Sequence, residues 1–295
     1  LLALAPMEDQ ALFDEVNRTD SSPRRFNETT FQFLSRSACS YFGVVRDLIN
    51  EWLSQVPAEH RYDLTRRLRK DDASHKAAFW ELYLHEGYRR SGYTIEIHPE
   101  LSETPKRPDF CIEGPTGDFY LEAVRVGDNA TKIATDRRLD TVHQLLSDLR
   151  VQNFTLFLTT DRVGPAPLAT KKLRRTLTQW VTGLDADEVS AAIDGVRVVG
   201  LRALPQLRWR DDDWDLTFSA GPLVTAGRGV DRPALGAMGS GTAGVVDNVS
   251  GLRRVLEKKH GRYGTLKLPL VIAVESDTVI PTRHHEIDRV LYGLS

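Results

Sequence analysis

The chain has 295 residues, of which 41% are hydrophobic, so it can bury one large core or two smaller ones. Its formal net charge of −2 excludes a globally basic protein, so any contact with nucleic acid must come from local basic clusters. The two cysteines give neither a disulfide framework nor a zinc pattern. The sequence contains no run of about eighteen apolar residues, so it predicts no membrane span. We expect a cytoplasmic protein.

Residues 1–72 are predicted to form an N-terminal helical segment. Apolar residues recur at close to helical spacing from Phe31 to Trp52, which predicts one helix there. A second helix is predicted from Glu59 to Lys70. It carries a basic run that includes Arg66 and Arg67, and such a run either meets phosphate or forms a solvated helix face.

The next stretch, residues 73–165, alternates between helical and extended patterns. An amphipathic helix is predicted over residues 77–84, followed by alternating residues 93–99 that indicate a strand. Two further strands follow, joined by a turn of composition Glu-Gly-Pro-Thr-Gly-Asp at 113–118. A helix over 136–149 and a short apolar strand over 154–158 complete the series.

Two carboxylates belong to this predicted hairpin. Asp109 follows Pro108 at the start of one strand, and Glu122 lies inside the next. A hairpin of this length brings both near one end of a small sheet, where like charges repel and burial is costly. A hard divalent cation, which prefers oxygen ligands, would suit that arrangement. The alternative is an ordinary turn opening followed by an edge-strand carboxylate.

The order helix, three strands, helix, strand, with Glu81, then Pro108-Asp109, then Glu122, resembles the core of the PD-(D/E)xK nuclease-like superfamily, which includes restriction endonucleases. The resemblance covers about residues 73–160. It implies an α/β (mixed α+β) fold with a restriction-endonuclease-like αβββαβ core. It also implies Glu81, Asp109 and Glu122 as catalytic residues, and Mg²⁺ or Mn²⁺ held by Asp109, Glu122 and the backbone carbonyl of Ala123.

One position departs from the family pattern. The family has a lysine two residues after the second carboxylate, where this chain has Val124. The neighbouring Arg125 is predicted to face the opposite side of the strand and stays charged, so it cannot act as a proton acceptor. Three alternatives remain: cleavage without the lysine, a degenerate site that does not cleave, or a lysine that has migrated. The candidates for a migrated lysine are Lys106, Lys132 and Lys258.

Residues 166–295 are predicted to form a mixed α/β extension packing on the core. Helices are predicted over 167–184 and 250–260, strands over 196–200 and 269–274, and a hairpin over 206–218. Residues 220–245 are rich in glycine, contain no Walker pattern and are expected to form a surface loop. Residues 286–293 add to the resemblance, together with the strand over 269–274. The basic residues Lys171, Lys172 and Arg175 join Arg66 and Arg67 as candidates for binding nucleic acid.

The preferred hypothesis is a metal-dependent phosphodiesterase that acts on DNA or RNA, with DNA as the favoured partner. A second hypothesis is a catalytically degenerate nuclease-like module that binds nucleic acid or another protein, which Val124 favours. A third is a subunit of a bacterial defence system that is active only when assembled, as a homodimer or with another subunit.

Overall fold

The computed structural model describes residues 11–127, 130–194, 200–236 and 248–277, with positions 287, 290 and 291. The fold is mixed α/β and divides into two compact units. The first unit comprises residues 1–24, 28–128 and 246–295, and the second comprises 25–27 and 129–245. In the chain the second unit is therefore inserted between two parts of the first. The predicted core, 73–165, is split at residue 128, and the predicted extension, 166–295, is shared between both units.

The first unit begins with four helices: α1 (Thr30–Arg36), α2 (Ser40–Ser54), α3 (Ala58–Lys70) and α4 (Asp72–Arg90). The single helix predicted from Phe31 to Trp52 is wrong, because the chain is extended at Ser37. There Ser37 forms a β-bridge with Asp20, and the amide of Ala38 donates to the carbonyl of Asp20. These contacts with a distant segment replace the hydrogen bonds that would continue the helix.

The four helices share one hydrophobic core, so α1–α3 do not stand apart from the helix that the resemblance placed in the nuclease-like core. Leu34, Ile49, Leu68 and Leu82, one from each helix, are at most 4% exposed and belong to the same cluster. Burial of this kind is the main source of helix stability, because short helices are marginal on their own.

A four-stranded sheet in the order β1-β2-β3-β9 forms the centre of the first unit. The strands are β1 (Thr94–Ile97), β2 (Phe110–Glu113), β3 (Phe119–Gly127) and β9 (Leu270–Asp277). The first three pair antiparallel, whereas β9 pairs parallel with β3. The tight turn between β2 and β3 needs Gly117, whose φ of 112° lies in a region that suits glycine.

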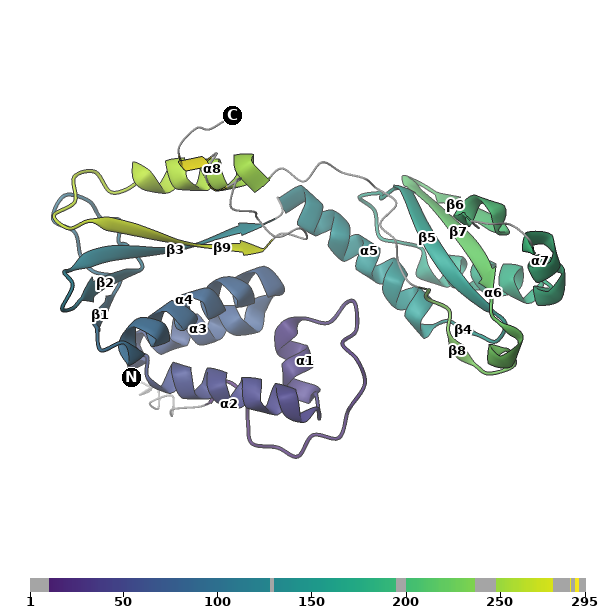
Figure 1. The fold of residues 1–295 in the computed structure, drawn as a ribbon, viewed down its shortest axis with the longest axis horizontal. Helices are drawn as coiled ribbons and strands as arrows, with labels where there is room; N and C mark the ends of the chain where they lie inside the picture. Colours follow the sequence, from purple (N-terminus) through teal and green to yellow (C-terminus); the bar gives the residue numbers. More distant parts are fainter. Residues whose placement is uncertain are drawn as a thin grey trace, which may run out of the picture. The chain divides into compact units, whose positions relative to one another are not determined.

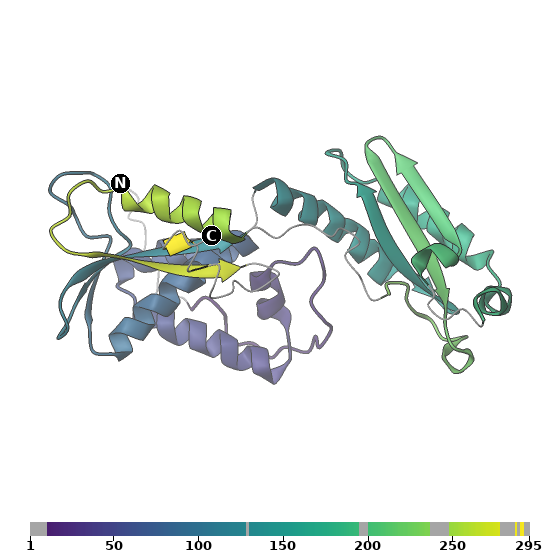
Figure 2. The same cartoon turned by 45° about the horizontal axis from the view of Figure 1, so that its top comes forward.

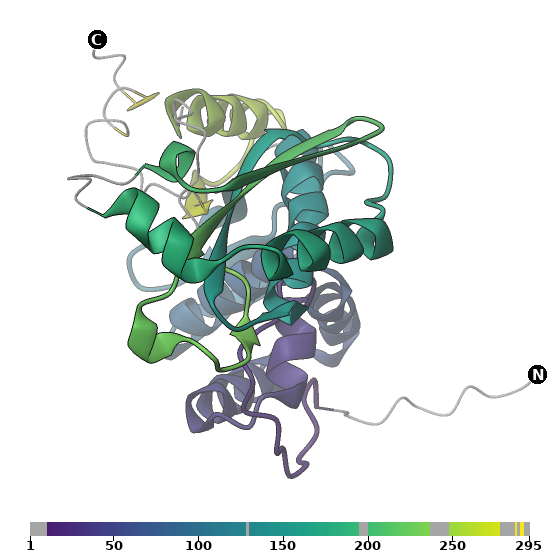
Figure 3. The ribbon, with the colours of Figure 1, turned by 90° about the vertical axis from the view of Figure 1, so that its right-hand side faces the viewer.

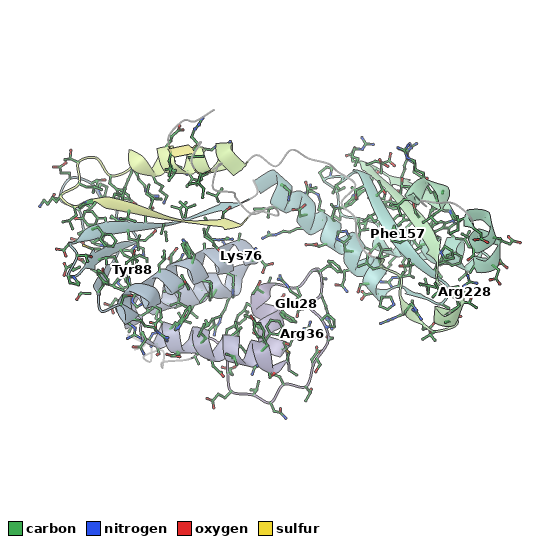
Figure 4. The ribbon with its side chains drawn as sticks, in the orientation of Figure 1. Glu28, Arg36, Lys76, Tyr88, Phe157 and Arg228 are labelled. Carbon is green, nitrogen blue, oxygen red and sulfur yellow. The ribbon has the colours of Figure 1, made fainter. Side chains whose placement is uncertain are left out.

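Helices cover both faces of this sheet (Figures 1 and 2). On one face, Leu121 and Ile112 pack against residues of α4, among them Leu84 and Tyr88. The ring of Tyr88, which is labelled in Figure 4, meets Phe119 edge-on at a centroid distance of 5.7 Å. On the other face lies α8 (Asn248–His260), which packs against β3. Alternate residues of β3 therefore contact different helices.

The fourth strand of this sheet was not the one expected from the sequence. The predicted helix over 136–149 and strand over 154–158 exist as α5 (Ala130–Asp148) and β5 (Phe154–Arg162), but both belong to the second unit. The parallel neighbour of β3 is β9, preceded by α8. An apolar strand pattern fixes which residues face a core, not which strand is the partner, and a parallel pair permits a long connection.

The second unit is built on the sheet β5-β7-β6, formed by β5, β6 (Gln206–Asp211) and β7 (Trp214–Pro222). The predicted hairpin over 206–218 is confirmed, with Asp212 at a φ of 47° in its turn. Leu156 and Phe218 pack with residues of α5 and of α6 (Thr170–Thr182) in one cluster. Figure 3 shows the strands and helices of this unit. The remaining described elements are α7 (Ala186–Ile193), β4 (Arg150–Val151), β8 (Arg232–Pro233) and the 3₁₀ turns η1 (Leu201–Ala203) and η2 (Thr225–Gly227).

Some predictions fall outside the described residues. They are most of the strand predicted over 196–200, most of the segment 286–293 and residues 237–245 of the glycine-rich stretch 220–245. The first half of that stretch contains the end of β7, η2 and β8.

Substitution of Leu121 by alanine should destabilise the first unit by about 3 kcal/mol, because the side chain is fully buried and leaves a cavity. Its register partner on β9, Val271, is 41% exposed and provides the matched control. Chemical denaturation monitored by circular dichroism checks both variants. Equal losses for Leu121→Ala and Val271→Ala would contradict the described packing of β3.

Candidate functional site

Asp109 and Glu122 come together because of the register of β2 and β3. Phe110 pairs with Leu121, so Asp109 and Glu122 occupy the next positions beyond this pair. The amide of Ala123 donates to Asp109 Oδ2 at 2.8 Å, which fixes the Asp109 carboxylate beside β3. The hairpin predicted from the sequence thus brings the two carboxylates to one end of the sheet.

Glu122 is 1% exposed and is surrounded by cationic and hydroxyl groups. The ammonium of Lys259, at the end of α8, contacts Oε1. The phenol of Tyr263, three residues past the helix end, donates to Oε2. Arg262 Nη1 lies 3.6 Å from Oε1. Pairing and hydrogen bonding of this kind compensate the cost of burying a charge.

The Tyr263 hydroxyl is itself part of this buried arrangement. Tyr263 is 2% exposed, and its hydroxyl also lies 3.3 Å from the carbonyl of Arg107. Burial, together with the hydrogen bond to Glu122, raises the pKa of Tyr263 well above its usual value of 10. The phenol therefore keeps its proton at all physiological pH values and remains a hydrogen-bond donor to the carboxylate.

Asp109, in contrast to Glu122, is surrounded by more negative than positive charge. Burial, followed by repulsion from Glu122 and Glu81, raises the pKa of Asp109 from 3.8 to about 6. The Ala123 amide and the charge of Lys259 only partly oppose this shift. Asp109 Oδ1 accepts no hydrogen bond from the part of the chain that the structure describes. The ionised carboxylate is thus short of positive charge.

Glu81 extends this group from α4, but it has a partner of its own. Arg67, on α3, donates to both Glu81 oxygens, from Nη1 at 2.7 Å and from Nη2 at 2.5 Å. Arg67 was expected to bind nucleic acid, whereas the structure turns it inward, 22% exposed, against Glu81. The bidentate geometry explains this, because a guanidinium fork matches a carboxylate.

Lys259 was missed among the candidates for a migrated lysine. Lys258, the neighbouring residue, is exposed, and Lys132 pairs with Asp136 in the second unit. Lys106 lies close to the site, but its ammonium donates to the carbonyl of Arg262 at 3.2 Å. The sequence does contain a signal for Lys259. It follows Leu252 and Leu256 at helical spacing, so it lies on the apolar face of α8, which packs on the sheet.

Val124 faces the same side of β3 as Glu122 and is 7% exposed. The position at which the resemblance implied a lysine is therefore occupied by a buried apolar side chain. Arg125, on the other side of the strand, pairs with Glu275 across the β3–β9 ladder. The positive charge beside Glu122 comes from α8 and the turn after it instead.

The other basic candidates lie on helix surfaces. Arg66 pairs with Asp63 at 2.6 Å, and Lys172 pairs with Asp211 at 2.6 Å. Lys171 and Arg175 are exposed on α6, opposite the buried Leu173 and Leu177. These pairs are solvent-exposed and contribute little to stability, so the side chains remain available to phosphate.

Comparison with known proteins gives no independent assignment, since no family model, curated protein or solved structure matches the chain. Within the described residues, no three His, Cys, Asp or Glu side chains are grouped to hold a metal ion. None of the described helices combines the length and apolar character that crossing a membrane requires.

The raised pKa of Asp109 predicts a pH-dependent stability effect. A carboxyl group with a folded pKa of about 6 and an unfolded value near 3.8 favours the fold below pH 3.8. That contribution is lost as the pH rises through 6. Asp109→Asn should therefore raise the free energy of unfolding by about 1–3 kcal/mol at pH 7.5.

The gain in free energy of unfolding of Asp109→Asn over the wild type should shrink steadily as the pH falls from 6 to 4. Denaturation of both proteins across this range, without divalent cations, measures the difference. A constant difference across the range would show that Asp109 titrates normally.

Proposed function

We propose that the first unit is a restriction-endonuclease-like core and that the protein is a metal-dependent phosphodiesterase acting on DNA or RNA. The element order α4, β1, β2, β3, α8, β9 supports this, because it is the αβββαβ order of that core. The second unit is then an insertion between the third strand and the second core helix.

The observation that carries the proposal is the contact between Lys259 and Glu122, beside Asp109. The superfamily resemblance implies two carboxylates and a lysine amine at one end of the sheet. Here Val124 cannot provide the amine, and Lys259 provides it from α8. An amine that reaches the same carboxylate from a different element favours a working site over a degenerate one.

The donor set fits a hydrated Mg²⁺ or Mn²⁺. Asp109 has one oxygen without a hydrogen bond, and repulsion from two other carboxylates raises its pKa. Mg²⁺ keeps several waters and takes only one or two protein carboxylates, so a cluster of three is not required. Asp109, Glu122 and the carbonyl of Ala123 would hold the ion, which when bound lowers the pKa of water and polarises phosphate.

The remaining groups have roles that follow from their contacts. Lys259 neutralises Glu122 and presents an ammonium group that can donate to a phosphate oxygen as charge develops there. Tyr263 fixes the rotamer of Glu122 through its second oxygen. Exposed basic residues of α6, Lys171 and Arg175 with Lys172, would contact backbone phosphates elsewhere on the substrate.

One observation favours a second candidate function, that of a non-cleaving module that binds nucleic acid or protein. Lys259 and Tyr263 bind both oxygens of Glu122, and Arg67 binds both oxygens of Glu81. Carboxylates whose oxygens all accept from protein groups are consistent with a purely structural role. Cleavage assays separate the two functions.

Lys259→Met should lower the rate of Mg²⁺- or Mn²⁺-dependent cleavage by about 10²–10³-fold, the usual effect of removing one donor to a developing charge. Lys258→Met, one residue earlier on the exposed face of α8, is the matched control and should cleave like the wild type. The assay uses plasmid, single-stranded DNA and RNA, with circular dichroism to verify folding. Equal activities of the two variants would exclude Lys259 from the reaction.

A lysine at position 124 should behave differently in two backgrounds. In the wild type, Val124→Lys adds a second cation near Glu122 and should leave cleavage level or reduce it. In Lys259→Met, the same substitution restores an amine on the Glu122 face of β3, and cleavage should recover by at least tenfold. Absence of cleavage by all these proteins, at high concentration and on every substrate, would favour the non-cleaving module.

A further inference from the structure

A pocket of about 190 Å³ opens beside the candidate site, within the first unit. Asp109 and Glu81 form part of its wall, so the pocket and the carboxylate group are contiguous. The rest of the wall comes from α3, α4 and the end of β1. One water molecule needs only about 10–15 Å³ of such a volume, so the pocket has room for a ligand of several atoms.

His85, on α4, provides an unsatisfied polar group in this wall. It is 5% exposed, and its Nδ1 is buried without a hydrogen-bond partner among the described residues. Burial lowers the pKa of His85, so the imidazole is neutral and offers one donor and one acceptor. Buried polar atoms normally have partners, and a ligand in the pocket that His85 lines can supply one.

The other polar lining residues select the kind of ligand. Four carboxyl groups line the pocket. Glu81 accepts from Arg67, and Asp63 pairs with Arg66 and Arg67, whereas Glu59 and Oδ1 of Asp109 accept no hydrogen bond from the described residues. An anionic group such as phosphate would be repelled from such a space. A neutral ring with amino hydrogens can donate to the open carboxylate oxygens of Glu59 and Asp109 and can hydrogen-bond to Nδ1 of His85.

Two further imidazoles line the pocket. His60 and His98 meet edge-on, with ring centroids 5.8 Å apart. His98 has a φ of 54°, an uncommon value for a residue with a side chain, and its amide donates to the carbonyl of Asp109 at 3.0 Å. Backbone strain of this kind concentrates at functional sites. Aromatic faces are the usual stacking partners of unpaired bases.

We propose that this pocket receives an unpaired nucleobase with an exocyclic amino group, from a nucleotide adjacent to the phosphate that the ion proposed at Asp109 would bind. This inference rests on the proposed function, since it assigns the base-binding part of the same site. The amino group of adenine, cytosine or guanine would donate to the pocket carboxylates, whereas uracil and thymine carry no such group. The protein would therefore act on single-stranded or locally opened substrates.

Direct binding tests the pocket without any cleavage. Adenosine, cytidine, uridine and ribose 5-phosphate are titrated into the full-length protein, with calorimetry and NMR as readouts. Adenosine and cytidine should bind at least tenfold more tightly than uridine, and ribose 5-phosphate should not bind. Equal affinity for all three nucleosides, or no binding by any, would overturn the proposal.

Variants then locate the binding. Glu59→Gln removes an exposed pocket carboxylate in the first turn of α3 and should weaken adenosine binding about tenfold. Glu113→Gln, an exposed carboxylate at the end of β2 outside the pocket, should leave the affinity unchanged. His85→Leu should also weaken binding, and Glu59→Gln keeps the test valid should that core variant fail to fold. Unchanged affinity in Glu59→Gln would overturn the assignment.

Cleavage of oligonucleotides with one abasic position distinguishes this proposal from the proposed function. A site that uses the pocket should lose at least tenfold in kcat/KM when the base next to the cleaved phosphate is missing. Equal cleavage of abasic and intact substrates would overturn the pocket and leave the nuclease intact. Nucleoside binding without cleavage of any substrate would support the pocket and overturn the proposed nuclease activity.

Discussion

The buried carboxylate of Glu122 is the constraint on which the candidate site depends. A charge that is 1% exposed must be paired and hydrogen-bonded, or its desolvation would outweigh the packing around it. Lys259 and Tyr263 meet this requirement together, one on each oxygen. Both come from the end of α8 and the turn after it, so the contact also fixes where that helix ends on the sheet.

This contact joins parts of the chain that are far apart in sequence. Lys259 and Glu122 are separated by 137 residues, most of which form the second unit. The parallel pairing of β3 with β9 closes the same long connection. Closing a loop of this length costs more entropy than a short turn, although the cost grows only slowly with length. The buried ion pair, the strand ladder and the packing of α8 on β3 offset it together.

Unlike Glu122, the carboxylate of Asp109 has too little positive charge and too few hydrogen-bond donors around it to balance its negative charge. Its neighbours include two other carboxylates, and its pKa of about 6 records the resulting repulsion. A group left in this condition lowers the stability of the fold at neutral pH, and such perturbation is common at functional sites. Glu122 is thus fully partnered and helps to hold the architecture, whereas Asp109 keeps one oxygen that accepts no hydrogen bond from the described residues.

The sequence by itself determined the local features of this site. The turn at 113–118 and the alternation of the flanking strands were enough to bring Asp109 and Glu122 to one end of a hairpin. Most helices were also predictable from their apolar spacing. The break at Ser37 was not, because the bridge to Asp20 that ends α1 comes from a distant segment.

Only the tertiary structure decided which strand lies beside β3 and which lysine reaches Glu122. Strands β5 and β9 are both apolar, and alternation specifies a buried face without specifying a partner. Lys258 and Lys259 are adjacent in sequence but point to different sides of α8, so choosing between them requires knowing what that helix covers. Periodicity is a local property, whereas a buried ion pair is a contact between surfaces that the chain brings together only on folding.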